Sequence, residues 1–184
     1  ESTDKDAGSW APGTSINVLV IRFADVLLMA AEVEANLGNL AKAQDYVNMV
    51  RTRAAKPNNI VYTYKDPANP ASGFSTTPAA NYKVSNYPAG NFAAGGKDYA
   101  LKAVYFERKI ELAMEGHRFF DIVRWGIADT ELSRYFAYQG AITQDVKTGK
   151  FTKGKNEYYP IPQRQIDLST VNGKPTLTQN PNYK

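Results

Sequence analysis

The sequence contains no cysteine, and this absence excludes several kinds of chemistry. Disulfide bonds, thiolate metal sites and cysteine nucleophiles all require that residue. Histidine is nearly absent too, because His117 is the only one in the chain. Most other metal centres in proteins depend on imidazole or thiolate ligands. We therefore expect neither a cofactor nor a metal centre.

The sequence also lacks a long apolar run and an apolar signal segment. A membrane-spanning helix needs about 18 apolar residues, and the longest candidate, residues 16–33, is interrupted by Arg22, Asp25 and Glu32. The chain opens with a polar segment, residues 1–6, and has no initiator methionine. We interpret the sequence as processed, truncated or excerpted from a longer protein.

Basic residues are in excess but are not concentrated. The formal net charge is +4 and the pI is about 9.1. Only residues 147–155 are locally basic, and their lysines alternate with glycine and threonine as in a solvated loop. A nucleic-acid surface would need a denser basic stripe interleaved with aromatic residues. The sequence therefore predicts no nucleic-acid partner.

Two helical patterns separated by a glycine fill residues 22–55. In the first, apolar residues recur at i, i+4, i+7 and i+11, with Leu27 and Ala31 widening a face formed by Val26, Ala30, Val33 and Leu37. Gly38 ends this pattern. In the second, apolar residues recur at helical intervals as far as Pro57, and they are Leu40, Ala43, Val47, Val50 and Ala54. The sequence predicts a helical hairpin over about 22–55.

This hairpin alternates small and large residues as tetratricopeptide repeats do, with Ala31 and Gly38 where two antiparallel helices can approach closely. A second helical pair is predicted over about 98–126, divided by Gly116. The predicted fold is all-α, with tetratricopeptide-like helical hairpins and long irregular loops in an α-α superhelix. The 43% apolar content and the length of 184 residues fit one domain, 1–184.

The segment Glu107 to Gly126 threads charges of both signs through an apolar helical pattern. Four apolar residues at helical spacing predict one buried stripe, namely Phe106, Ile110, Ala113 and Met114. Glu107, Glu111 and Glu115 stack on the neighbouring face and would repel one another without cations. We expect arginines to form ion pairs with these carboxylates in a structural charge network. Its members are Glu107, Arg108, Glu111, Glu115, Arg118, Asp121 and Arg124.

A competing interpretation makes Glu111, Glu115 and His117 a metal or acid/base site. Carboxylate sites in helix bundles use a Glu-x-x-His spacing, whereas Gly116 alone separates Glu115 from His117. This spacing favours the structural network.

Residues 57–97 form a long loop with five prolines, four glycines, six asparagines and a single acidic residue. We see no helical or alternating pattern in it, and loops of this length in compact domains are commonly functional or disordered. Its aromatic residues argue against disorder. Rings beside Asn and Lys side chains suit a sugar or peptide surface, so the candidate ligand-binding residues are Tyr62, Tyr64, Phe74, Tyr82 and Tyr87. The alternative is that these rings pin the loop onto the helices.

The rest of the chain is rich in turns. A short helix is predicted over 129–138, followed by an irregular C-terminal region, 139–184. Within that region 158–162 is extended, because each proline disfavours helix at the residue before it. One helical turn is expected over 163–168, and the tail that carries Pro181 and Tyr183 is expected to be packed.

Four sequence blocks resemble the C-terminal half of the SusD/RagB family of Bacteroidetes surface lipoproteins. They are Ile21 to Glu32, the hairpin end Val50 to Ala54, Glu107 to Gly126, and Tyr159 to Pro162 together with Gln179 to Tyr183. The resemblance covers roughly residues 16–183, with 57–97 unmatched. The family's lipidated N-terminal cysteine and N-terminal half are absent, so this chain resembles a fragment.

The resemblance implies a non-catalytic component of an outer-membrane nutrient-uptake system. Family members bind glycans or other nutrients, carry a lipid anchor at the cell surface, and cover a TonB-dependent transporter of the SusC type. No binding residue is carried over, because the aromatic platform of the starch-binding member comes largely from upstream regions. Two alternatives remain: an interaction scaffold of the tetratricopeptide type without its own small ligand, and a glycoside hydrolase using Glu111 and Glu115.

Overall fold

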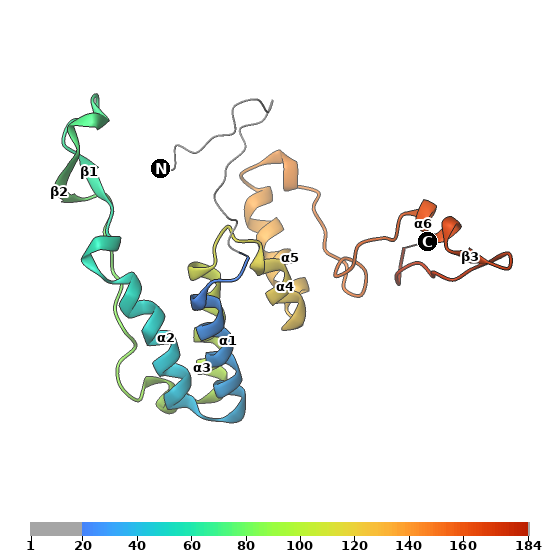
Figure 1. The fold of residues 1–184 in the computed structure, drawn as a ribbon, viewed down its shortest axis with the longest axis horizontal. Coiled ribbons are helices and arrows are strands. Elements are labelled where there is room, and N and C mark those ends of the chain that lie inside the picture. Colours follow the sequence, from blue (N-terminus) through green and yellow to red (C-terminus); the bar gives the residue numbers. More distant parts are fainter. Residues whose placement is uncertain (1–19, 184) are drawn as a thin grey trace. The chain divides into compact units, whose positions relative to one another are not determined.

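The computed structural model describes residues 20–183 and is mostly helical, which confirms the predicted fold class (Figure 1). The six α-helices of the described chain are α1 Phe23–Leu37, α2 Leu40–Ala54, α3 Asn91–Glu111, α4 His117–Arg124, α5 Ala128–Gly140 and α6 Gln163–Leu168. The strands are β1 Tyr62–Tyr64, β2 Phe74–Pro78, β3 Thr170–Val171 and β4 Lys174–Pro175, with short 3-10 turns at Pro57–Asn59, Pro70–Ser72 and Gln144–Val146. No helix among these is long and apolar enough to span a bilayer.

The chain divides into two compact units, residues 1–115 and residues 116–184. In the first unit α1 and α2 form the helical hairpin and α3 packs against both of them. In the second unit α4 packs against α5. The pair expected over 98–126 is therefore shared between the units, since α3 belongs to the first and α4 to the second. The expectation of one domain over 1–184 stays a prediction.

The α1–α2 turn follows from Gly38, which adopts a left-handed conformation with φ of 86°. The Gly38 and Asn39 amides donate to the carbonyls of Ala35 and Glu34, so the last turn of α1 is closed by backbone hydrogen bonds. The core of the unit lies where the three helices meet and consists of small and medium residues together with Phe92, namely Ala24, Leu27, Leu28, Ala31, Ala35, Ala43, Val47, Val50, Phe92, Ala100, Ala103 and Val104. The alanines let the helices approach closely, as the repeat pattern predicted.

The predicted buried face of α1 is wrong in part. Leu27 and Ala31 are buried, but Val26, Val33 and Leu37 are exposed, and Leu37 reaches 70%. The buried face instead includes the charged residues Asp25 and Glu32. Because α1 carries apolar residues on both faces, periodicity alone could not identify the inward one.

The predicted buried stripe of α3 is also wrong. Phe106 and Ile110 are exposed, and Met114, in the turn after the helix, is fully exposed with φ of 67°. The inward face carries Ala103 and Val104, with Glu107 and Arg108 buried beside them. These buried charges are paired, so the charged face of α3 is the one that packs.

Residues 57–97 contain more regular structure than the sequence indicated. Strands β1 and β2 pair antiparallel, with Tyr64 opposite Phe74 and Tyr62 opposite Pro78, and the register shifts between the two pairs. Helix α3 begins at Asn91, earlier than predicted, and is kinked at Gly96, whose φ is 78°. Strands of three and five residues give too short an alternation to stand out in the sequence.

The second unit has a small apolar core of Ile122, Ala128 and Phe151. The side chains of Phe119, Trp125, Leu132 and Phe136 pack against this core from α4, α5 and the turn between them. The predicted helices at 129–138 and 163–168 correspond to α5 and α6. The remaining segment is irregular apart from the β3–β4 pair.

The C-terminal tail is held against residues 154–161 by side-chain amides. Gln179 donates to the Ile161 carbonyl and accepts from the Ile161 amide, both at 2.8 Å. Asn180 donates to the Tyr159 carbonyl, and Asn182 donates to the Gly154 carbonyl at 2.9 Å. The tail is thus packed, as expected.

Candidate functional site

The three glutamates singled out in the sequence meet arginines of the first hairpin. Arg22, at the start of α1, holds the Glu111 carboxylate at 2.8 Å and the Glu115 carboxylate at 2.7 Å. From α2, Arg51 pairs with Glu107 and Arg53 pairs with Glu111. Hydrogen bonds to the two carboxylates raise the pKa of Arg22 above its ordinary value. These contacts fasten α3 to the ends of α1 and α2.

The arginines assigned to these glutamates from the sequence bind other acids. Arg108 makes a 2.7 Å ion pair with Asp25, and both side chains are buried. In the second unit Arg118 pairs with Glu131, and Arg124 lies 3.1 Å from Asp121. The ion pairs of the seven residues thus bring in further partners, including Arg22, Asp25 and Glu131, and a single network of the seven remains a prediction. The sequence analysis missed Arg22, Arg51, Arg53 and Asp25 because they lie far away along the chain.

The carboxylates of Glu111 and Glu115 are engaged by arginines, which leaves little for a catalytic or metal-binding role. Both accept hydrogen bonds from Arg22, and Glu111 also accepts one from Arg53. Across residues 20–183, no group of three acidic, histidine or cysteine side chains is placed to hold a metal ion. The geometry of this cluster supports a structural role.

The loop rings divide into two environments, and Tyr87 is partly buried against the core. Its ring packs edge-on against Phe92 at 5.1 Å, and the Arg51 guanidinium lies 4.7 Å from the ring centre. Its hydroxyl donates to Glu107 at 3.3 Å. Burial, followed by the negative charge of Glu107, raises the pKa of Tyr87 to about 12. This ring pins the loop to the helices, which was the alternative interpretation of the aromatic residues.

Two amide side chains of α2 hold the same stretch of loop. Asn48 accepts from the Tyr87 amide at 2.8 Å and donates to the Tyr87 carbonyl at 3.1 Å. Gln44, which is buried, donates to the Pro88 carbonyl and accepts from the Phe92 amide, each at 2.9 Å. These bonds fix residues 87–92 to α2, at the point where the loop leads into α3.

Tyr64 and Phe74 occupy the other environment, on the β1–β2 hairpin that follows α2 (Figure 1). Their rings stack with centroids 5.2 Å apart and planes inclined by 18°. They remain 46% and 58% exposed. Tyr62 lies two residues before Tyr64 and so faces the same side of the hairpin. Two of the five candidate rings are therefore stacked on each other, and Tyr62 lies on the same strand opposite Pro78.

Tyr82 stands apart in the segment between β2 and α3, and its side chain is exposed. Among the described residues no ring contact joins Tyr82 or Tyr87 to the hairpin rings. The five candidates thus comprise the stacked pair with Tyr62 on the same hairpin, one separate exposed ring and one ring packed against the core.

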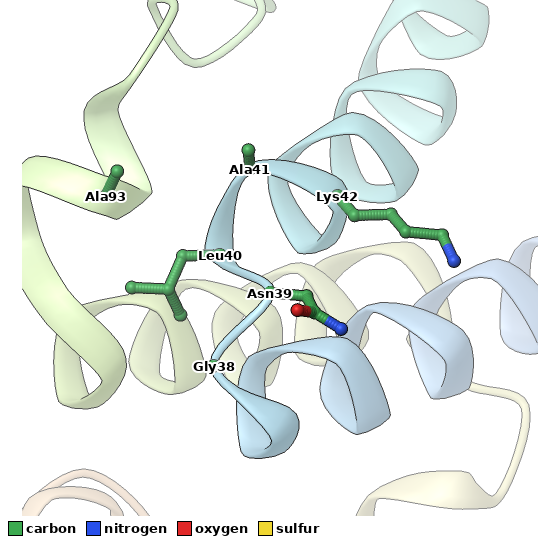
Figure 2. Close-up of a pocket in the computed structure, with 6 residues that line it drawn as sticks. All are labelled: Gly38, Asn39, Leu40, Ala41, Lys42 and Ala93. Carbon is green, nitrogen blue, oxygen red and sulfur yellow. The ribbon is translucent and has the colours of Figure 1, made fainter.

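A pocket at the α1–α2 turn is lined by Gly38, Asn39, Leu40, Ala41, Lys42 and Ala93 (Figure 2). In Figure 2 the Lys42 side chain points away from Ala93. Asn39 donates to Glu34 at 2.7 Å, and the Lys42 ammonium lies 2.6 Å from the other Glu34 oxygen. These contacts lower the pKa of Glu34, with the Lys42 hydrogen bond as the main cause. Because its polar side chains are already paired, this pocket is a poorer ligand site than the hairpin.

Comparisons with known proteins agree with the sequence blocks. Residues 2–183 match the family model of the SusD family. The "SusD-like protein P25" of Formosa agariphila is 36% identical over 171 residues, which is 90% of this chain and 25% of that protein. The crystal structure of a SusD homolog from Bacteroides thetaiotaomicron VPI-5482 gives a TM-score of 0.58 at 30% identity, covering 89% of this chain and 26% of that one. The chain spans about a quarter of the length of these relatives.

Proposed function

The chain belongs to the SusD family, and from that membership we propose that it is part of a glycan-binding component of an outer-membrane uptake system. Proteins of this family are non-catalytic accessories of polysaccharide utilisation that bind glycans or other nutrients. The engaged carboxylates of Glu111 and Glu115 support a binding role over hydrolysis.

The partner in this proposal is a TonB-dependent outer-membrane transporter of the SusC type, to which the bound nutrient passes. SusD proteins work together with outer-membrane transporters, which supports this choice. The proposed location is the outer face of the outer membrane, through a lipid anchor on the full-length protein. The ligand is a glycan or another nutrient of comparable size.

The observation that carries the proposal is the set of exposed rings between residues 60 and 87. Tyr64, Phe74 and Tyr82 are all exposed, and only one acidic residue lies in this part of the chain. Exposed aromatic rings beside neutral polar side chains are suited to the apolar faces and hydroxyl groups of sugars. The five candidate rings remain our proposed ligand contacts, with Tyr87 the least accessible.

The test is calorimetric titration of the chain with a panel of soluble oligosaccharides, combined with product analysis after prolonged incubation. We expect saturable binding of at least one oligosaccharide and no shortened products. Tyr82→Ala should weaken binding, whereas Tyr138→Ala, which removes an exposed ring from α5, serves as the control. Binding of no saccharide would contradict the proposal, and released sugars would revive the hydrolase alternative.

A second candidate function, a protein interaction scaffold, is favoured by the exposed apolar side chains along α1. Tetratricopeptide arrays use helical surfaces of this kind to grip other proteins. Capture of the cognate transporter by a chain that binds no saccharide would support the scaffold. A chain that captures the transporter and also binds a saccharide would support the proposed role in the uptake system.

A further inference from the structure

The β1–β2 hairpin has two faces of different character. On one face Thr63 and Ser75 share a 2.6 Å hydrogen bond between their hydroxyls, and the Thr77 amide donates to the Ser75 hydroxyl at 3.0 Å. Their hydroxyls therefore make bonds within the hairpin. On the opposite face lie the rings of Tyr62, Tyr64 and Phe74, with Pro78 beside Tyr62. This aromatic face makes no comparable bonds, and its two stacked rings are open to solvent.

The stacked pair presents ring surface in a fixed arrangement. The two rings stack on each other through one face each, and both side chains remain exposed to solvent. Tyr62, two residues along the same strand, extends the aromatic face by about 7 Å. Backbone pairing between β1 and β2 and the hydroxyl bonds on the far face hold the rings in place. An arrangement already ordered before binding reduces the entropy lost on association.

The hairpin is electrically balanced. Between Ile60 and Ala79 its only charged residues are Lys65 and Asp66, which are adjacent and opposite in sign. The Asp66 carboxylate also accepts a 2.9 Å hydrogen bond from the Ala68 amide. An anionic ligand would be expected to meet a cluster of lysines or arginines, and the hairpin has no such cluster.

A peptide adding as a further strand fits the hairpin less well. Pro78 is the last residue of β2 and Pro70 lies in the turn before it, the register of the pair is irregular, and β1 has three residues. Proline and irregular pairing discourage strand addition at an edge. The open feature of the hairpin is therefore its ring face.

We infer that the β1–β2 hairpin is a ligand-binding element and that it takes an uncharged oligosaccharide, whose sugar rings stack on Tyr64 and Phe74. This inference rests on the proposed function and assigns it a particular surface and a chemical class of ligand. The C–H groups on the faces of the sugar rings contact the aromatic rings, and no covalent step is involved.

The experiment compares the wild-type chain with Tyr64→Ala/Phe74→Ala by titration with neutral hexasaccharides of different linkage and with one uronic-acid hexasaccharide. We expect the double variant to bind neutral ligands about tenfold more weakly or worse, because two stacking rings are lost. Tyr64→Phe should bind nearly as the wild type does, since the ring is kept. Tyr138→Ala, a matched loss of an exposed ring in the second unit, should leave affinity unchanged.

A second double variant, Tyr64→Leu/Phe74→Leu, keeps an apolar cross-strand pair while removing the aromatic faces. It should lose binding as the alanine variant does, with helical circular dichroism unchanged in both. Unaltered affinity of both double variants in a chain that binds sugar would overturn the hairpin assignment and leave the proposed function standing. Preference for the uronic-acid ligand would overturn the uncharged class. A wild-type chain that binds no saccharide would instead contradict the proposed function itself.

Discussion

Tyr87 joins the loop to the ion pair of Arg51 and Glu107, and its pKa offers a way to measure that contact. The pKa is raised to about 12, so the folded state keeps the phenol protonated where an unfolded chain loses the proton near pH 10. The contribution of Tyr87 to the free energy of unfolding is therefore fully present below about pH 10 and is lost as the pH rises through 12. We expect the stability of the chain to fall more steeply over this range than that of Tyr87→Phe, measured by urea unfolding at stepped pH.

The same substitution has a spectroscopic signature. The chain has twelve tyrosines, and the ultraviolet titration of tyrosinate should show a late step near pH 12 that Tyr87→Phe lacks. Tyr82→Phe removes an exposed phenol and should retain the late step. A late step that survives Tyr87→Phe would place the raised pKa on another residue.

The ion pair formed by Asp25 and Arg108 is buried on both sides, with its charged atoms 2.7 Å apart. Asp25→Ala leaves a buried guanidinium without this partner, and loss of one member of such a pair costs about 3–5 kcal/mol. We expect a loss of that order in the free energy of unfolding, followed by circular dichroism in urea. The double variant Asp25→Leu/Arg108→Met removes both charges and should recover much of the loss.

The control for this pair is Lys42→Ala, which removes the exposed partner of Glu34 on the same hairpin. Exposed ion pairs contribute little to stability, so this variant should unfold as the wild type does. If Asp25→Ala also unfolded as the wild type does, the buried pair would not hold α1 to α3.

At the scale of elements, the C-terminal tail is predicted to stabilise the second unit through its amide side chains. Asn180→Ala and Asn182→Ala each remove a donor to a backbone carbonyl in residues 154–159. Each should cost about 0.5–1.5 kcal/mol, the usual net value of a hydrogen bond. The loss should appear as faster hydrogen exchange and proteolysis in residues 150–161, with the first unit unchanged. In the control variant Lys174→Ala, at an exposed position of β4, hydrogen exchange and proteolysis of residues 150–161 should be as slow as in the wild type.

The helices could be predicted from the sequence, and so could the inward face of α2, which buries Ala43, Val47 and Val50, but the inward faces of α1 and α3 could not. Apolar spacing and glycine positions identified the α1–α2 hairpin, α5 and α6, because those signals are local. The orientation of α1 and α3 depends on Asp25, Glu107 and Arg108, which are buried because they are paired. Local patterns assign such residues to the solvent side, and their partners lie more than fifty residues away.

The candidate site shows the same limit. Composition identified the aromatic segment. Which rings stack on each other and which ring packs against the helices became evident only from the pairing of β1 with β2. Tyr87 and Tyr64 look alike in the sequence, since both stand among asparagines, prolines and lysines. The difference arises from Arg51, Asn48 and Phe92, which surround Tyr87 and not the hairpin.

At the scale of the whole molecule, α1 is apolar on two opposite faces. One face is buried in the first unit, and the other exposes Phe23, Val26, Met29, Val33 and Leu37. Near the start of α1 this second face adjoins an apolar pocket, which is lined by Ile21 before the helix and by helix residues that include Leu27, Met49 and Val50. Helices that are apolar all round are normally buried, and exposed apolar patches of this kind promote association.

We therefore expect the 184-residue chain on its own to bind hydrophobic dyes and to associate at high concentration. Val33→Glu/Leu37→Glu should reduce both effects while leaving the urea midpoint nearly unchanged, because these side chains are exposed. Leu28→Ala, on the buried face, should instead lower the urea midpoint, because it should cost about 2–5 kcal/mol in the free energy of unfolding. Light scattering and dye fluorescence measure the first pair of effects. Equal dye binding and association by the wild type and the double glutamate variant would show that another surface is responsible.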